Sequence, residues 1–150
     1  MSTMERTLAL LRKEGWTLAI VEKWLAAIQI RQDMFGFADV VAIGESLGIM
    51  AVQVCADSGR AAHRTKILAE KRALTWLRAG GRILLISWGK HGPRGGRKVW
   101  EAYREEITEE QIKITEAAVK KAECRACDGS GFVTTDDGGA ECPKCKEVKP

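Results

Sequence analysis

The 150-residue sequence lacks the features that would place it in a membrane or outside the cell. No apolar run approaches the roughly 20 residues that a helix needs to cross a bilayer. The opening residues, Met1 to Glu5, lack the cationic stretch and apolar core of a secretory signal. We therefore expect a soluble intracellular protein with no membrane partner.

Cysteine is scarce in most of the chain: the first 123 residues contain only Cys55, and they show no internal repeat. The other four cysteines form the pairs Cys124-x-x-Cys127 and Cys142-x-x-Cys145, which 14 residues separate. In an intracellular protein such pairs indicate a metal site more often than disulfides, and this spacing matches a tetrahedral zinc site. Because all four ligands are thiolates, the predicted Zn²⁺ site is closed and structural. A redox dithiol pair is the alternative.

Composition is that of a folded protein, with 45% hydrophobic and 29% charged residues. The net charge of +4 is compatible with a polyanionic partner. A chain of this length has room for one compact domain and a small appendage. We expect an α/β domain over residues 1–107, a connecting helix over 108–123 and a four-cysteine zinc module over 124–150.

The hydrophobic pattern predicts helices and strands in alternation. Helices are predicted over residues 3–14, 58–79 and 108–123, and strands over residues 17–21, 28–31, 39–43, 49–54, 82–88 and 97–107. This order is typical of an α/β fold in which helices flank a central mixed sheet.

Two polar residues interrupt the apolar strands of the predicted hairpin over residues 39–54. Asp39 opens the first strand and Gln53 stands near the end of the second. An unpaired polar group in such a position costs about 1–3 kcal/mol, so we expect the two side chains to meet and to hold a metal ion. Glu5 on the first helix is a third candidate, since Mg²⁺ takes oxygen ligands. Alternatively, Asp39 ends a turn, Gln53 is a hydrogen-bonded core residue and Glu5 is solvated.

Basic residues dominate the segment from 60 to 98, in which Glu70 is the only acid. On one face they would form a phosphate-binding surface for duplex DNA, although a solvated helix face is the commoner fate of such charges. Neither a helix-turn-helix nor a zinc-finger spacing indicates sequence-specific reading. The candidate residues are Arg60, His63, Arg64, Lys66, Lys71, Arg72, Lys90, Arg94, Arg97 and Lys98.

Several of these segments resemble a known family. Glu5-Arg6, Leu10 to Trp16, Phe37 to Ile43 and Val52 to Cys55 are similar to motifs of the PD-(D/E)xK nuclease superfamily. Within it, the resemblance is to archaeal-type Holliday-junction resolvases and their phage or bacterial relatives, over about residues 4–90. Separately, Cys124 to Gly131 resembles the CxxCxGxG repeat of DnaJ-type zinc modules.

The resemblance implies a restriction-endonuclease-like fold and hydrolysis of duplex or branched DNA. It assigns Mg²⁺ or Mn²⁺ to Glu5, Asp39 and Gln53, and puts Cys55 where the family has its lysine. Lys66 or His63 would then replace that lysine. It also implies a homodimer in the cytoplasm of a prokaryote or of a phage-infected cell.

Two other functions fit the same sequence. One is a catalytically inactive module that keeps the nuclease fold to bind DNA or a protein, because Gln53 and Cys55 depart from the family pattern. The other is a zinc-dependent protein-interaction factor in which the α/β domain is a scaffold.

Overall fold

The computed structural model describes residues 1–25, 30–124, 127, 130–135 and 138–146. The chain divides into two compact units, Met1–Thr108 and Glu109–Pro150. The first contains the main sheet and the second contains the paired cysteines.

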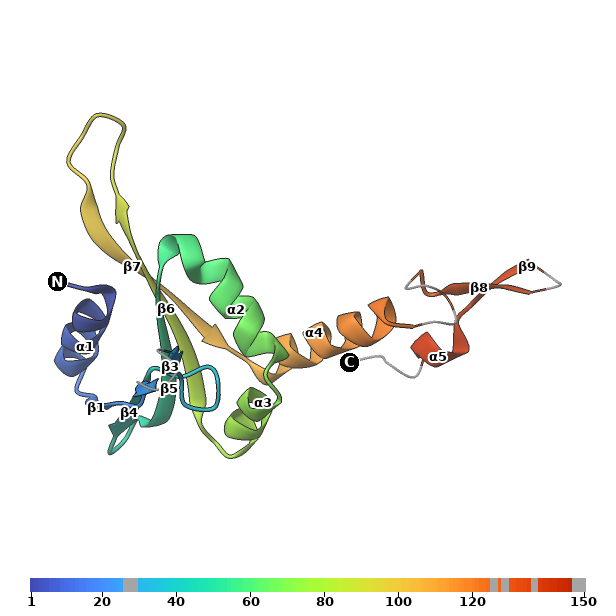
Figure 1. Ribbon diagram of the computed structural model, residues 1–150, viewed down its shortest axis with the longest axis horizontal. Helices are drawn as coiled ribbons and strands as arrows, with labels where there is room; N and C mark the ends of the chain where they lie inside the picture. Colours follow the sequence, from blue (N-terminus) through green and yellow to red (C-terminus); the bar gives the residue numbers. More distant parts are fainter. Residues whose placement is uncertain (26–29, 125–126, 128–129, 136–137, 147–150) are drawn as a thin grey trace. The chain divides into compact units, whose positions relative to one another are not determined.

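A five-stranded mixed sheet in the order β1-β4-β5-β6-β7 forms the centre of the N-terminal unit (Figure 1). Only β5 and β6 are parallel, and all other neighbours are antiparallel. A parallel pair needs a crossover, which here contains η1, α2 and α3. The strands are β1 (Thr17–Ile20), β4 (Val40–Gly44), β5 (Gly48–Ala56), β6 (Arg82–His91) and β7 (Val99–Ile107). Beside this sheet, β2 (Lys23–Leu25) pairs with β3 (Ile30–Gln32).

Helices lie on both faces of the sheet, as Figure 1 shows for α1 (Thr3–Lys13) and α2 (Arg60–Ala69). Neighbouring residues of β7 point to opposite faces. Arg104 bonds to Glu14 just after α1, whereas Glu105 bonds to Arg64 of α2. The predicted α/β class, with a mixed sheet flanked by helices, is therefore confirmed.

The main core lies between α1 and the sheet. Leu8 and Leu11 of α1 pack with Trp16 against apolar side chains of β4, β5 and β6. Ser2 begins α1 with a capping box, in which its hydroxyl accepts from the Glu5 amide and the Glu5 carboxylate accepts from the Ser2 amide. Gly15, at a φ of 87°, turns the chain away after the helix.

The helix predicted over residues 58–79 is divided into three pieces: η1 (Asp57–Gly59), α2 and α3 (Lys71–Arg78). The break is at Glu70, whose backbone is extended and whose side chain accepts from the Arg72 amide. Glu70 thus caps α3, a role that hydrophobic periodicity does not reveal. Of the strand predicted over residues 28–31, positions 28 and 29 lie outside the described residues.

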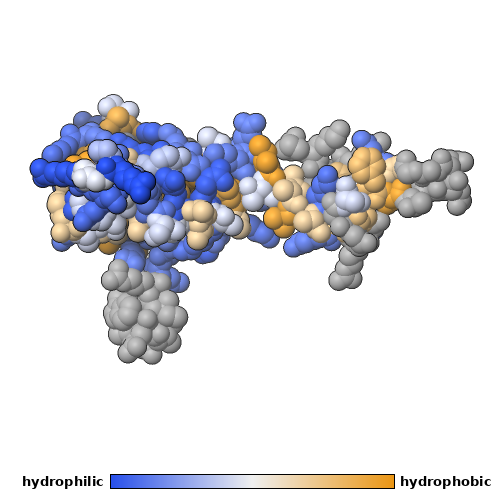
Figure 2. Space-filling view, turned by 90° about the horizontal axis from the view of Figure 1, so that it is seen from above, coloured by the Kyte–Doolittle hydropathy of each residue, from blue (hydrophilic) through white to orange (hydrophobic). Residues whose placement is uncertain are grey.

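The C-terminal unit contains α4 (Glu109–Ala122), a hairpin of β8 (Phe132–Thr135) and β9 (Gly138–Glu141), and the short helix α5 (Pro143–Lys146). In the described parts of both units, no helix is long and apolar enough to span a membrane. The view in Figure 2 shows mainly hydrophilic side chains over the N-terminal unit.

Leu11 offers a test of the packing between α1 and the sheet, because its side chain is 0% exposed. We expect Leu11→Ala to lower the free energy of unfolding by about 2–5 kcal/mol through lost burial and a residual cavity. Leu47→Ala is the control: its side chain is 42% exposed, so its cost should stay below about 1 kcal/mol. Urea unfolding followed by tryptophan fluorescence measures both. Equal costs would contradict the described core.

Candidate metal centre

The junction of β4 and β5 brings Asp39 and Gln53 together, as the sequence predicts. Val40 pairs with Val52, so the preceding Asp39 lies opposite Gln53. The Asp39 Oδ2 atom accepts hydrogen bonds from Gln53 Nε2 at 2.6 Å and from the Val54 amide at 2.8 Å. Asp39 is only 5% exposed and Gln53 only 2%. A buried carboxylate is therefore fixed at the end of the sheet.

Two further acids, Glu22 and Asp33, join Asp39. One carboxylate oxygen of each residue lies within 4.8 Å of the others. The Asp39 carbonyl accepts from the amides of Val21 at 2.8 Å and Glu22 at 3.2 Å, which holds the chain after β1 against this site. We name Glu22, Asp33 and Asp39 the acid cluster.

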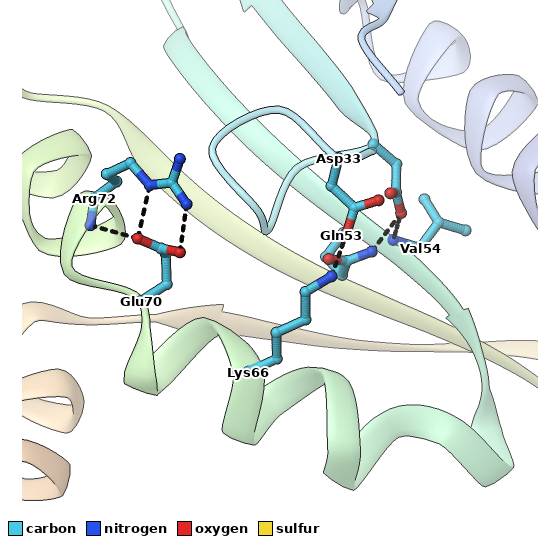
Figure 3. A network of polar contacts seen from close by, with 7 residues as sticks. Asp33, Gln53, Val54, Lys66, Glu70 and Arg72 are labelled. Carbon is cyan, nitrogen blue, oxygen red and sulfur yellow. Dashed lines mark hydrogen bonds and ion pairs between the residues drawn. The ribbon is translucent and has the colours of Figure 1, made fainter. Parts of the chain in front are cut away.

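Lys66 supplies a cation to the acid cluster. It reaches from α2 and donates a hydrogen bond to Asp33, as Figure 3 shows. The same view shows Gln53 and Val54 on β5 next to this contact. Of the candidate residues from the basic segment, Lys66 is thus placed at the acids.

A pocket of about 190 Å³ opens at the acid cluster. The Gln53 side chain donates through its nitrogen, but its oxygen, Oε1, is buried and has no hydrogen-bond partner among the described residues. The Nδ1 atom of His63 is also buried without a described partner. The pocket is lined by Thr3, Met4, Glu22, Asp33, Asp39, Gln53, Val54 and His63.

Burial raises the pKa of Asp39 to about 7, from an ordinary value of 3.8. The hydrogen bond from the Val54 amide opposes this shift, while the nearby carboxylates of Asp33 and Glu22 add to it. Above this pKa three negative charges share the site, with Lys66 as a neighbouring cation. A divalent cation would relieve that repulsion and replace the Asp39 proton.

The donor atoms fit Mg²⁺ or Mn²⁺. Carboxylates and an amide carbonyl are the hard oxygen ligands that these ions prefer. The orphaned Oε1 atom of Gln53 is a second, independent sign, because a buried polar atom without a partner costs free energy unless a ligand binds it.

Glu5, the third ligand predicted from the sequence, is held elsewhere. Its carboxylate accepts from the Ser2 amide at 2.6 Å, its side chain is 63% exposed, and it is not part of the acid cluster. These bonds to Ser2 lower its pKa. Glu22 and Asp33 were not predicted as site residues from the sequence. The one sequence feature that could have indicated them is that each acid comes within two residues of the end of a strand.

The other predicted phosphate-binding residues fall into two groups. Arg60 and Arg64 of α2 bond to acids of this chain, Asp57 at 3.3 Å and Glu105 at 2.7 Å. Arg72 likewise bonds to Glu70. The second group is exposed: Lys71 at the start of α3, Lys90 near the end of β6, and Arg94, Arg97 and Lys98 in the loop before β7. Cys55 of β5 is 6% exposed, and burial raises its pKa to about 11. Its thiol is therefore protonated near neutral pH.

The four cysteines of the C-terminal unit lie together, each with its Sγ atom within 4.8 Å of the others. Cys124 and Cys142 are 3.8 Å apart, and Cys127 and Cys145 are 3.5 Å apart. Tetrahedral zinc with Zn–S bonds of about 2.3 Å requires S–S distances of about 3.8 Å. The Gly131 amide also donates to Cys127 Sγ at 3.3 Å. The cluster can hold a zinc ion, in agreement with the spacing.

No protein-family model matches the chain, and searches of curated proteins and of solved structures find no match either. Any function assigned to it therefore depends on its residues and their geometry.

The raised pKa of Asp39 predicts a pH-dependent stability that Asp39→Asn removes. Between pH 4 and 7 the folded protein binds the Asp39 proton more tightly than the unfolded chain, so its stability falls as pH rises. Asparagine cannot ionise. The variant should therefore gain roughly 2–4 kcal/mol over the parent between pH 4 and pH 8. Urea unfolding without added divalent cations measures this, and parallel pH curves would refute the buried charge.

The four-cysteine cluster predicts one zinc ion per chain. Metal analysis of the purified protein should give one zinc for the parent and none for Cys142→Ser, whose thiol is fully buried in the cluster. Cys55→Ser is the matched control, because Cys55 is the one cysteine outside the cluster, and it should keep its zinc. Equal zinc content in both variants would rule out this ligand set.

Proposed function

We propose that the N-terminal unit is a nuclease that hydrolyses phosphodiester bonds in duplex or branched DNA with bound Mg²⁺ or Mn²⁺. The observation that carries this proposal is the acid cluster, which has the unpartnered Gln53 oxygen beside it and Lys66 on one of its carboxylates. Three acids around one pocket, with a lysine bound to one of them, are groups that metal-assisted phosphoryl chemistry can use.

The fold supports this proposal. A mixed sheet with helices on both faces is compatible with the restriction-endonuclease-like architecture that the sequence resemblance implies. Asp39 at the start of one strand and Gln53 on its neighbour occupy the two strand positions of the PD-(D/E)xK pattern. The ligand set differs from that pattern: Glu22 and Asp33 replace the helix acid, and Lys66 comes from α2. The resemblance also suggests a homodimer.

Each side chain has a distinct task in this proposal. The carboxylates of Glu22, Asp33 and Asp39 and the Gln53 oxygen would hold the cation, which supplies Lewis-acid activation of water and phosphate. Lys66 fixes the Asp33 carboxylate and brings positive charge to the pocket, where a phosphate would bind. His63 lines the pocket, and its Nδ1 atom has no partner among the described residues, so this side chain would be available to a water molecule or a phosphate in the pocket.

The zinc module has a separate, structural task. A site closed by four thiolates has no open position for substrate, so zinc would act by stabilising the fold of the C-terminal unit.

An inactive DNA-binding or protein-interaction module is the second candidate. Glutamine at position 53 and cysteine at position 55 favour it, since they remove one negative ligand and one cation from the family pattern. In that case metal binding and cleavage would both be absent while the fold persists.

Cleavage of supercoiled plasmid and of a four-way DNA junction with Mn²⁺ distinguishes the two candidates. Asp39→Ala and Asp33→Asn should each reduce the cleavage rate at least 100-fold, because each removes a charged ligand. Circular dichroism of the variants checks that they remain folded.

Glu5→Gln is the matched control. It also removes one negative charge, but from the predicted ligand that is not part of the acid cluster. It should keep the parental rate within about threefold. No cleavage by the parent favours the inactive module. Loss of activity in Glu5→Gln with activity retained in Asp33→Asn would reject the acid cluster as the site.

A further inference from the structure

The strands β6 and β7 continue past the rest of the sheet as a two-stranded ribbon. They pair from Ile83 with Ile107 to His91 with Val99. The neighbouring strand β5 ends earlier, where Ala56 pairs with Trp88. Residues 89–101 therefore extend beyond β5, and Figure 1 shows them as a long arm. Residues 89–91 pair with residues 99–101, and residues 92–98 form the loop between them. Residues 90–101 are all exposed. We name residues 89–101 the ribbon.

The ribbon carries four cationic side chains and one acid, Glu101, at its base. From Gly89 to Trp100 the sequence contains no Asp or Glu. None of its lysines and arginines forms an ion pair with any residue that the structure describes. These four residues are Lys90, Arg94, Arg97 and Lys98. They differ in this respect from Arg60 and Arg64 on α2, which acids of the chain already bind.

The ribbon leaves the sheet at the end where the acid cluster lies. Because β5 and β6 are parallel, their C-terminal ends meet at the same edge. Gln53 and Val54, near the end of β5, line the pocket, and the ribbon begins at Gly89 of β6, one residue after Trp88 pairs with the last residue of β5. The first turn of α1 contacts both the pocket and the ribbon. Met4 lines the pocket, and the Arg6 guanidinium lies 4.4 Å from the ring centre of Trp100 in the ribbon.

Contacts from both faces of the sheet hold the base of the ribbon. On the α1 side, Trp88 donates to Thr7 at 2.8 Å, in addition to the Arg6–Trp100 contact. On the α2 side, Arg60 lies 4.1 Å from the Tyr103 ring centre, and Asp57 contacts His91 at 3.0 Å. Gly89 permits this last contact, because a Cβ there would lie 2.7 Å from the Asp57 carboxylate.

We infer that the ribbon binds in the major groove of duplex DNA, with its four cations on the phosphates that border the groove. The groove of B-DNA admits a two-stranded β-ribbon, and Lys and Arg are the residues that neutralise phosphate. The tip, His91 to Gly96, offers mostly glycine and proline beside Arg94, so we expect little sequence preference. This inference rests on the proposed function, because it assumes that DNA is the substrate. It adds that the DNA bound at the site is double-stranded.

Fluorescence anisotropy of a labelled 30-base-pair duplex tests the ribbon, using the full chain without added magnesium or manganese. The variant carries Lys90→Ala, Arg94→Ala, Arg97→Ala and Lys98→Ala, all at exposed positions. Each lost phosphate contact should reduce the slope of log affinity against log salt by about 1, so we expect a total reduction of about 3–4. The dissociation constant at 0.1 M salt should rise at least tenfold, and a single strand of the same sequence should compete poorly.

The control loses the same charge from four exposed cations that are not candidate phosphate-binding residues, through Arg12→Ala, Lys13→Ala, Lys120→Ala and Lys121→Ala. It should change the dissociation constant less than threefold. Equal effects of the two variants, or equal competition by single strand and duplex, would overturn the inference. Because no cleavage is needed, a parent that binds through the ribbon without cutting DNA would refute only the nuclease. A parent that cuts while the ribbon variant binds normally would refute only the ribbon.

Discussion

A carboxylate buried at the junction of two strands is the constraint on which the proposed site depends. Asp39 is 5% exposed, and its carboxylate accepts hydrogen bonds from the Gln53 side chain and the Val54 amide. Removing a carboxylate from water is costly unless it is paired, and here the nearest charged groups include two more acids. Lys66 offsets part of this negative charge through its contact with Asp33. A bound divalent cation would stabilise the ionised cluster further.

Patterns of neighbouring residues in the sequence predicted the hairpin, the cysteine cluster and the fold class. The hairpin placed Asp39 opposite Gln53 because its strands are apolar and a turn fixes their register. The two CxxC pairs indicated the cysteine cluster, since each motif brings two thiols to one side. The α/β class followed from the order of periodic segments.

The rest of the site depends on tertiary contacts that leave no periodic signal. Glu22 reaches the acid cluster because β1 pairs with β4 and the Asp39 carbonyl accepts from the Glu22 amide. Asp33 reaches it because the chain reverses at Phe35 and Gly36, which have positive φ, and Met34 forms a bridge to Ala38. Glu5 looked equivalent in the sequence, but its own N-cap residue binds it first. The Ser2 amide lies within one helical turn of Glu5, so the Glu5 carboxylate bonds to it in preference to a distant metal site.

The proposed divalent-cation site at these oxygens is tested most directly by anomalous X-ray scattering at the manganese edge. A crystal soaked in MnCl₂ above pH 7.5 should give an anomalous peak within bonding distance of the Asp39 carboxylate and the Gln53 oxygen. Glu22 or Asp33 should complete the contacts. The four-cysteine cluster provides an internal control, because a zinc edge measurement should locate its own ion there. A pocket without manganese density in a crystal that shows the zinc peak would contradict the account.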